Sequence, residues 1–322
     1  MSVLTLLFLL LFSPTLLAAV YELPPEGQHL VGEGFFVIAR HEDTLVDIAA
    51  RHGIGYDEIK AANPEVDPWL PGERTRVFIP AEFVLPAEPR QGMVINLAEK
   101  RIYYYPRPAA NERPKLHTYP ISIGRQNWET PLGQTRIVRK RKDPTWTPPE
   151  SIREEHAAKG DILPDVVPAG PDNPLGDRAM YLGIPGYLIH GTNKPAGIGM
   201  RVSHGCIRME PDNIRELFEL VPANTPVKLI DVPFKFGIRQ GLIYLEAQQP
   251  ANSSIHMHQD REQLTGLLLE ATGGEFDFEL DWDRLDQAIK NPRGIPLPVG
   301  SLSSVGVGVG VGVGPQTETG LF

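Results

Sequence analysis

Glycine and proline are unusually frequent in this chain, and they limit what it can fold into. Its 322 residues include 31 glycines and 32 prolines, about a fifth of the chain against roughly 12% in average proteins. Both residue types interrupt helices, because proline lacks a backbone N–H donor and glycine loses the most conformational entropy on folding. The composition therefore excludes a helical bundle and favours a mainly β fold with many loops.

The charge balance narrows the range of partners. The chain carries 31 Lys and Arg against 40 Asp and Glu, a net charge of −9. Nucleic acid needs clustered positive charge to neutralise its phosphates, so we exclude nucleic acid as a partner. One basic run, residues 136–142, holds five Lys and Arg. It is either a solvated strand edge or a wall for an anionic substrate.

The N-terminus resembles an export signal. Residues 3–12 are mostly Leu, Val and Phe, and a short stretch ending in Ala18-Ala19 follows. This pattern predicts a signal peptide over residues 1–19. A single membrane anchor is the alternative, but the apolar run is short for a span of about 20 residues. Export makes Cys206, the one cysteine, a candidate functional residue. A lone thiol in an oxidising compartment is usually lost unless it forms a disulfide between chains or takes part in a reaction.

The pattern of residues 35–80 predicts a small β-α-α-β unit, entered through a Pro/Gly-rich linker at residues 22–34. A strand at 36–38 precedes a helix with its N-cap at Asp43-Thr44, and Gly53 ends that helix. A second short helix, 57–62, stops at Asn63-Pro64, and a strand follows at 77–80.

Residues 91–231 predict a larger, mainly β domain after a Pro-rich bridge. A hairpin of 93–97 and 101–105 opens it. Tyr103, Tyr104 and Tyr105 either pack within this hairpin or form a glycan platform. Further strands are expected at 116–123, 134–138, 179–182, 187–190 and 227–230, with helices at 150–159 and 211–221.

A C-terminal extension is predicted over residues 232–300. It contains a hairpin of 234–238 and 242–246, followed by helices at 260–271 and 281–290. Residues 301–322 include a Val-Gly repeat without large side chains. Such a repeat buries too little surface to offset its ordering entropy, so we expect a flexible tail.

The segment around Cys206 has the residue types of a thiol catalyst. It reads Ser203-His204-Gly205-Cys206, and His190 ends a predicted strand upstream. An imidazole can take the proton of an attacking thiol, and a glycine beside the nucleophile leaves backbone N–H groups free for an oxyanion. We expect a thiolate that exists before substrate arrives.

Two other interpretations of these residues remain open. Cys206 can be a small core residue, as buried cysteines often are. His190, His204 and Cys206 can also form a three-ligand zinc site. For catalysis, no carboxylate stands near either motif, so a backbone carbonyl such as that of Gly191 would orient the ring of His190.

The motifs "IHGT" and "VSHGCIRM" resemble the signature of L,D-transpeptidases with a YkuD-type catalytic domain. "TPLG", "PTWTPP" and "PAGPDNPLG" support this resemblance, and residues 35–80 resemble a LysM module, which binds N-acetylglucosamine glycans. Together they resemble the ErfK/YbiS group over residues 22–247. The implied fold is a β-sandwich-like catalytic domain behind a LysM module, and the implied compartment is the periplasm.

The resemblance also implies site residues. It makes Cys206 the nucleophile and His190 the proton donor and acceptor. The remaining implied site residues are Gly191, whose carbonyl orients His190; His204 and Gly205 of the nucleophile motif; and Ser203 and Arg208, which contact substrate.

The implied reaction acts on peptidoglycan and needs no cofactor or metal. Cys206 would attack a tetrapeptide stem at the bond before its terminal D-Ala and form a thioester. The acceptor amine would belong to a Braun-type lipoprotein or to another stem, whereas water would give an L,D-carboxypeptidase. A non-catalytic wall-binding protein is the rival from another class. We also expect residues 193–201 to be a mobile cover, because they contain Pro195, Gly197 and Gly199.

Overall fold

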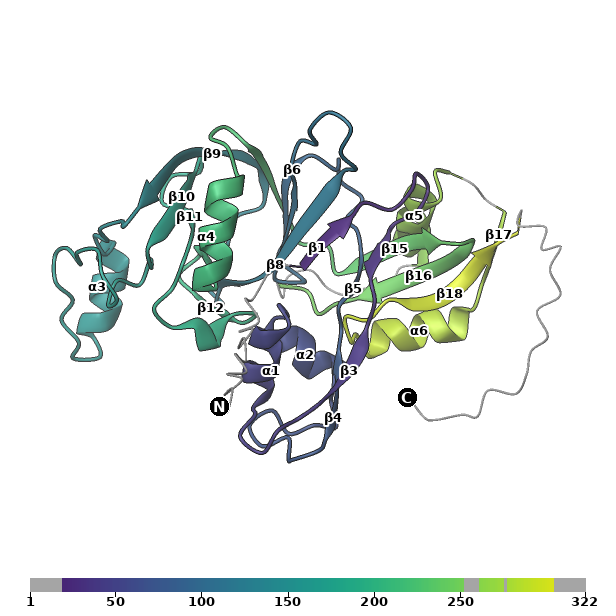
Figure 1. Cartoon of the computed structure of the whole chain (residues 1–322), viewed down its shortest axis with the longest axis horizontal. Coiled ribbons are helices and arrows are strands. Elements are labelled where there is room, and N and C mark those ends of the chain that lie inside the picture. Colours follow the sequence, from purple (N-terminus) through teal and green to yellow (C-terminus); the bar gives the residue numbers. More distant parts are fainter. Residues whose placement is uncertain (1–18, 252–260, 275–276, 304–322) are drawn as a thin grey trace, which may run out of the picture.

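The computed structural model describes residues 19–251, 261–274 and 277–303. Its centre is a ten-stranded sheet in which the path β1-β8-β13-β11-β10-β9-β14-β6-β7 closes on itself, because β7 also pairs with β8 (Figure 1). The mainly β expectation is confirmed, with the sheet curled into a closed ring. The strands are β1 Ala19–Glu22, β6 Gly92–Asn96, β7 Arg101–Tyr105, β8 Lys115–Gly124, β9 Gly133–Lys142, β10 Arg178–Leu182, β11 Leu188–His190, β12 Arg201–Ser203, β13 Ile207–Met209 and β14 Pro226–Ile230.

Both faces of the β6–β7 hairpin are buried, and they serve different cores. Met93 and Ile95 belong to the core inside the sheet, whereas Val94 lies between them in the chain and faces the N-terminal unit. This alternation is the two-residue period of a strand. Helix α4 (Pro211–Leu220) covers the inner core, with Ile214 and Leu217 fully buried.

The tyrosine run follows the same alternation. Tyr104 faces the inner core, and Tyr103 and Tyr105 face the outer one. All three side chains are at most 3% exposed. The glycan-platform interpretation is therefore wrong, because no ring face is open to a sugar, and packing within the hairpin is the role that the structure supports.

The N-terminal unit has the expected β-α-α-β order. It consists of β3 (Phe35–Ile38), α1 (Leu45–Arg51), α2 (Tyr56–Ala62) and β4 (Arg76–Ile79), with β3 and β4 antiparallel. Thr44 caps α1 in a capping box with Asp47. The unit is not a separate domain joined by a flexible linker, because its core is continuous with the outer face of the central sheet.

A buried ion pair joins the N-terminal unit to the β6–β7 turn. Arg101 is fully buried and donates from Nε and Nη2 to the carboxylate of Glu58 on α2, each at 2.8 Å. The same carboxylate accepts the Gly55 N–H at 2.5 Å and so caps α2. Removing either partner would leave the other charge buried and unpaired, which costs about 3–5 kcal/mol.

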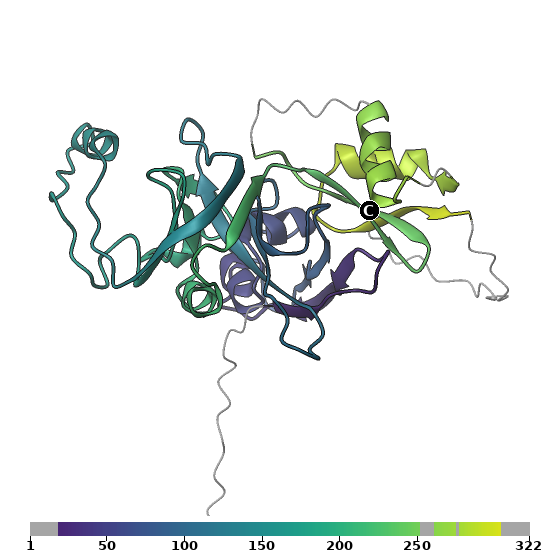
Figure 2. The same cartoon turned by 90° about the horizontal axis from the view of Figure 1, so that it is seen from above.

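The C-terminal unit is a second, four-stranded sheet in the order β15-β16-β18-β17. Helices α5 (Arg261–Ala271) and α6 (Trp282–Lys290) accompany it, and Leu285 and Ile289 of α6 lie in its core. Figure 2 shows this unit and the segment around α3 (Glu150–Ala157) at opposite ends of the molecule. The strands are β15 Phe234–Arg239, β16 Leu242–Ala247, β17 Phe278–Leu280 and β18 Leu297–Leu302.

Several boundaries differ from those expected from sequence. The segment expected as a linker contains β2 (Leu30–Gly32), which pairs with β5 (Glu82–Val84) in the Pro-rich bridge. Ala19, expected to end the signal peptide, lies in β1 opposite Thr118. Leu302, expected in the tail, ends β18. The rest of the expected signal peptide and residues 304–322 of the tail lie outside the described residues.

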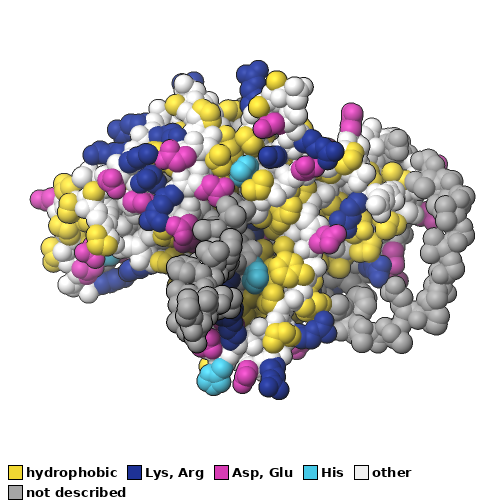
Figure 3. Space-filling model, in the orientation of Figure 1, with side chains coloured by type: hydrophobic (Ala, Val, Ile, Leu, Met, Phe, Trp, Pro, Cys, Tyr) yellow, Lys and Arg dark blue, Asp and Glu magenta, His cyan; other side chains and the backbone are white. Residues whose placement is uncertain are grey.

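Within the described ranges, no helix is both long and apolar enough to span a bilayer. The basic run of residues 136–142 lies on β9, which is not an edge strand, because it pairs with both β10 and β14. Figure 3 shows Lys and Arg side chains gathered at this end of the molecule, at the upper left. Lys140 from this run donates to the carbonyls of Phe218 and Val221 and so closes the C-terminal end of α4.

Candidate active site

Two short parallel strands bring the sequence motifs together. Strands β11 and β13 pair with Ile189 opposite Ile207 and His190 opposite Arg208. Ile189 and Ile207 point into the inner core. Because side chains alternate along a strand, His190 and Arg208 share the other face, and Cys206, just before β13, continues that side. The parallel register therefore explains why residues sixteen positions apart form one site.

The turn that carries Cys206 is tightly braced. Ser203 is fully buried, and its hydroxyl donates to the Cys206 carbonyl at 2.5 Å and accepts the Gly205 N–H at 3.2 Å. Thr130 donates its hydroxyl to the Gly205 carbonyl at 2.8 Å. These bonds hold the main chain on both sides of the thiol.

Glycine is required at position 205. Gly205 has φ +98°, and a Cβ there would meet the ring of Tyr187 at 3.0 Å. A side chain at this position would be strained by the positive φ and by the close contact with Tyr187. Since the Gly205 N–H already donates to Ser203, the donors left for an oxyanion in this turn are other amides.

The imidazole of His190 is buried and neutral. It is 3% exposed, and its Nδ1 lies 2.6 Å from the Gly191 carbonyl. A carbonyl only accepts, so Nδ1 carries the proton and Nε2 keeps its lone pair. Burial, together with the nearby charge of Arg208, lowers the pKa of His190 to about 3.

The Gly191 carbonyl is held by close backbone packing. A Cβ on Gly176, at φ +65°, would lie 2.9 Å from the Thr192 nitrogen and 3.0 Å from the Gly191 Cα. The "PAGPDNPLG" segment that contains Gly176 is anchored by Asn173, whose side chain donates to the carbonyls of Pro144 and Pro168. This segment therefore supports the group that orients His190.

The thiol of Cys206 is partly exposed, and it donates to the Gly186 carbonyl at 3.5 Å. Burial raises the pKa of Cys206, and the Leu188 N–H and the charge of Arg208 oppose that shift. The expected thiolate before substrate arrives stays a prediction, and burial of the thiol works against it. Within the described chain, Cys206 and His190 each bond a backbone carbonyl and not each other.

Arg208 lies beside His190 and Cys206, and one N–H group of its guanidinium makes no hydrogen bond. Its Nε is buried and has no hydrogen-bond partner among the described residues. Burial lowers the pKa of Arg208. A buried donor without a partner is costly, so this Nε is poised to receive an acceptor from a ligand.

His204 is turned toward the α3 segment. Its Nε2 lies 2.9 Å from both the Glu155 carboxylate and the Arg125 guanidinium, and its ring meets Trp128 edge-on at 4.7 Å between centroids. Glu155 and Arg125 are themselves ion-paired. In the described ranges no three His, Cys, Asp or Glu side chains are grouped as metal ligands. The zinc interpretation fails because His204 is committed to this polar cluster.

Sequence reasoning missed several supporting residues. Thr130 lies in the "TPLG" segment, and Asn173 and Gly176 lie in "PAGPDNPLG". Both segments support the family resemblance, which gave no role to these residues. Arg125 and Glu155 had no local signal, because their contact with His204 joins parts of the chain that are far apart in sequence.

The segment predicted as a mobile cover, residues 193–201, is bonded to β8 through its second half. The Gly199 N–H donates to the Ile121 carbonyl at 3.2 Å, and Ser122 donates to the Gly197 carbonyl at 2.7 Å. A short 3-10 turn, Pro195–Gly197, forms within the segment. The mobility of this segment stays a prediction for hydrogen exchange, and the bonds at Gly197 and Gly199 limit it to the residues before them.

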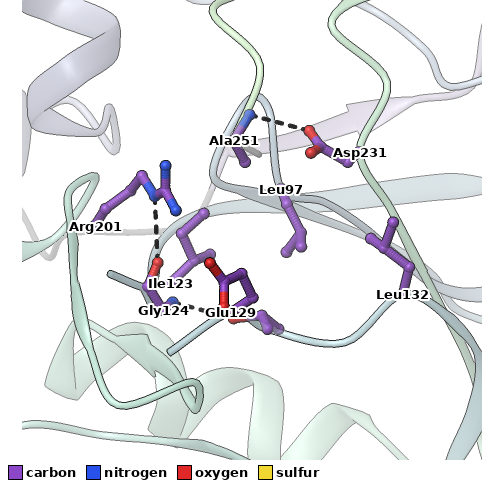
Figure 4. A pocket seen from close by; sticks show the side chains of 9 residues that line it. Leu97, Ile123, Gly124, Glu129, Leu132, Arg201, Asp231 and Ala251 are labelled. Carbon is purple, nitrogen blue, oxygen red and sulfur yellow. Dashed lines mark hydrogen bonds between the residues drawn. The ribbon is translucent and has the colours of Figure 1, made fainter. Parts of the chain in front are cut away.

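A small cavity lies behind the braced turn. Gly124, Glu129 and Arg201 line it, and Arg201 donates to the Gly124 carbonyl at 3.3 Å (Figure 4). Its volume of about 20 Å³ suits one water molecule. It is therefore too small for a substrate.

Comparison with known proteins identifies the family of this chain. The YkuD L,D-transpeptidase catalytic domain family matches residues 90–229. "Probable L,D-transpeptidase ErfK/SrfK" of Escherichia coli is 41% identical over 303 residues, covering 91% of this chain and 95% of that protein. "Probable L,D-transpeptidase YbiS" of the same organism is 40% identical over 294 residues, covering 89% and 94%. The solution structure of the Enterococcus faecium L,D-transpeptidase catalytic domain is 23% identical, with TM-score 0.31, over 44% of this chain and 96% of that one. The predicted family is confirmed: this chain belongs to the L,D-transpeptidases and is an enzyme of that family, with a YkuD-type catalytic domain.

Proposed function

We propose that this enzyme cleaves peptidoglycan tetrapeptide stems before the terminal D-Ala and passes the acyl group through a thioester on Cys206. The observation that supports this most strongly is the shared face of His190, Arg208 and Cys206, set by the parallel register of β11 and β13. One side chain is a nucleophile, one is a neutral base, and one is a cation with an unused donor.

The proton path follows from the tautomer of His190. Because Nδ1 is held by the Gly191 carbonyl, Nε2 is the atom that accepts the thiol proton as Sγ attacks the stem carbonyl. The C–N bond to D-Ala then breaks, and the same proton passes to the leaving amine. The raised pKa of Cys206 means that the proton leaves during attack and not before.

Two further groups complete the proposed site. The Nε of Arg208 would donate to a stem carboxylate, which supplies the acceptor that this buried atom lacks. The amides of His204 and Cys206 would stabilise the oxyanion, since the Gly205 amide is taken by Ser203. Ser203 would act by holding the turn and not by touching substrate.

The second half-reaction returns the enzyme to its starting state. An amine attacks the thioester, its proton is taken by Nε2 of His190, and the proton returns to the thiolate as the new amide forms. The amine would come from the lysine of a Braun-type lipoprotein or from a diamino acid of another stem. Water in its place makes an L,D-carboxypeptidase.

We also propose that residues 35–80 are a LysM-type glycan-binding module and that the protein is exported to the periplasm by residues 1–19. The module carries exposed aromatic side chains suited to stacking on sugar rings: Phe35, Phe36 and Trp69 are 43%, 41% and 59% exposed. Trp69 stacks on Tyr56 at 6.1 Å between centroids.

The test is D-Ala release from a soluble disaccharide-tetrapeptide by purified protein, with mass analysis of the trapped enzyme. We expect free D-Ala and a thioester adduct on Cys206, and neither from Cys206→Ala. Added lysine-bearing peptide or a second stem separates the acceptors by the mass of the product. Turnover without dependence on Cys206 would refute the mechanism.

A further inference from the structure

A second cavity lies in a different part of the molecule from Cys206. Its volume is about 1100 Å³, and it lies between helix α2, the β6–β7 turn and the segment from α6 to β18. No residue of β11, β13 or the nucleophile turn lines it. Figure 1 shows α2, β4 and α6 gathered in this region, below the central sheet. The volume is at the upper end for ligand sites and exceeds what a single ion needs.

Arg293 gives the clearest sign of what the cavity holds. Its Nε is buried without a hydrogen-bond partner among the described residues. Its Nη2 makes one long bond, 3.2 Å, to the Ala62 carbonyl at the end of α2. A guanidinium bonds best to a carboxylate, which can take two of its N–H groups at once.

The charge of the lining points to the same ligand class. Among the described residues that line the cavity, four cations have no carboxylate partner, whereas Glu65 is the one acid without a cation. Lys100 pairs with Asp57 at 3.1 Å, and the other two lining acids pair with cations outside the lining. The unpaired cations are Lys60, Arg284, Lys290 and Arg293. This local surplus contrasts with the net charge of −9 for the whole chain, so it favours an anionic ligand.

The rest of the lining suits a peptide. Gln249, Gln287 and Asn291 offer amides that can both donate and accept, as backbone peptide groups require. Phe78 and Leu297 add apolar surface for side chains. A bare phosphate or a nucleotide would not use this combination of amides and apolar surface.

We propose that this cavity binds the carboxylate-bearing stem peptide of a second peptidoglycan chain, away from the catalytic thiol. The proposal rests on the proposed function for its choice of stem peptide over an acidic protein segment. Helix α2 connects the two sites: Arg293 bonds its C-terminal end, and its N-terminal end bonds the chain that leads to Cys206.

The test is calorimetric titration of the Cys206→Ala protein with a soluble disaccharide-tetrapeptide. We expect two molecules bound per protein. Arg284→Gln combined with Arg293→Gln should leave one molecule bound, with an unchanged melting temperature. The matched control is Arg107→Gln, an exposed arginine beyond the other end of the β6–β7 hairpin, which should still bind two.

Each other outcome decides against part of the proposal. A stoichiometry of one in the parent overturns it, and so does an acidic protein peptide that displaces the second molecule more readily than the stem peptide does. If the double variant unfolds, Arg293→Lys keeps the charge without the fork and should weaken that one site about tenfold. D-Ala release by the parent enzyme is measured separately. Its absence with two molecules still bound would refute the catalytic proposal alone.

Discussion

A Cβ atom on Gly199 would lie 2.2 Å from the backbone nitrogen of Tyr56, so the two segments meet with no room for a side chain. The Tyr56 N–H donates to the Ile198 carbonyl at 3.1 Å, and the Asp57 N–H donates to the Gly199 carbonyl at 3.4 Å. The start of α2 is thereby fixed to the segment that runs directly into β12 and the Cys206 turn. The N-terminal unit is part of the support of the catalytic site.

Gly199→Ala should separate these two parts of the molecule. Gly199 has φ +88°, where a side chain costs about 1–2 kcal/mol, and the collision with backbone atoms adds to that cost. We expect the free energy of unfolding to fall by more than about 2 kcal/mol and D-Ala release to fall at least tenfold. Denaturant unfolding and the D-Ala assay measure the two effects.

The matched control for Gly199 is Gly27→Ala. Gly27 has a similar φ of +76°, but nothing lies within 4 Å of a Cβ there. This variant should lose only the backbone cost, about 1 kcal/mol, and keep its activity. Equal effects of the two substitutions would show that the Gly199 contact has no role beyond its backbone angle.

The titration of His190 should make stability depend on pH. Its pKa is lowered to about 3 in the fold and is about 6.5 when unfolded. The unfolded chain therefore binds a proton that the folded chain refuses between these values. Stability from this group is full above about pH 6.5 and is lost as pH falls toward 3, by about 5 kcal/mol. Denaturant unfolding at several pH values measures the slope.

His190→Gln removes the titrating ring and keeps a polar side chain near Gly191. We expect this variant to lack the part of the acid destabilisation that belongs to His190, so its stability relative to the parent should rise by about 5 kcal/mol as pH falls from 6.5 to 3. A difference that stays constant over this range would mean that His190 titrates normally and is not buried as a neutral ring.

The sequence predicted helices and strands well where apolar residues recur with a single clear spacing. The amphipathic helix at 211–221 and the capped helix after Thr44 both formed, because their apolar spacing and caps are local properties. Strands β2, β12, β13 and β17 are each three residues long, too short for any periodic signal. They exist because partners distant in sequence pair with them.

The chemistry of the candidate site could be predicted only in part from the sequence. Residue types singled out Cys206, His190 and the carbonyl of Gly191, and the family resemblance added a substrate contact for Arg208. The protonation of the pair was not predictable, because burial decides it and burial depends on the whole fold. The core shared by the N-terminal unit and the catalytic sheet was also not predictable from sequence. The residues that form it alternate along the strands with residues of the inner core, so they give no separate pattern.

Lys235→Met should loosen the C-terminal unit from the catalytic sheet. The Lys235 ammonium is 2% exposed and pairs with Glu99 of the β6–β7 turn and, at 3.2 Å, with Glu246. Without it the Glu99 carboxylate is buried without its cation, which costs about 3–5 kcal/mol, and it lies near Glu246, whose pKa burial raises to about 8. Lys228→Met is the control, because its partner Glu88 lies nearer solvent and such pairs contribute about 0–1 kcal/mol. Equal losses in thermal unfolding would contradict the role of Lys235.

Glu155→Gln should release the α3 segment from the nucleophile turn. Glu155 reaches from α3 to His204, two residues before Cys206, and also bonds Arg125 and Lys159. These partners, with Lys159 first and His204 next, lower the pKa of Glu155 to about 2, so it stays charged at every working pH. An amide can donate or accept but cannot neutralise the guanidinium. Hydrogen exchange over residues 150–157 should therefore quicken and kcat/KM should fall about tenfold, near 1.4 kcal/mol of barrier.

The melting temperature of Glu155→Gln should hardly move, because exposed ion pairs contribute little. Glu154→Gln, one position away, changes an exposed side chain that makes no ion pair or hydrogen bond with the described residues, and it should change neither quantity. Faster exchange with unchanged kcat/KM would show that α3 is tethered through Glu155 but that the tether does not position the turn of Cys206.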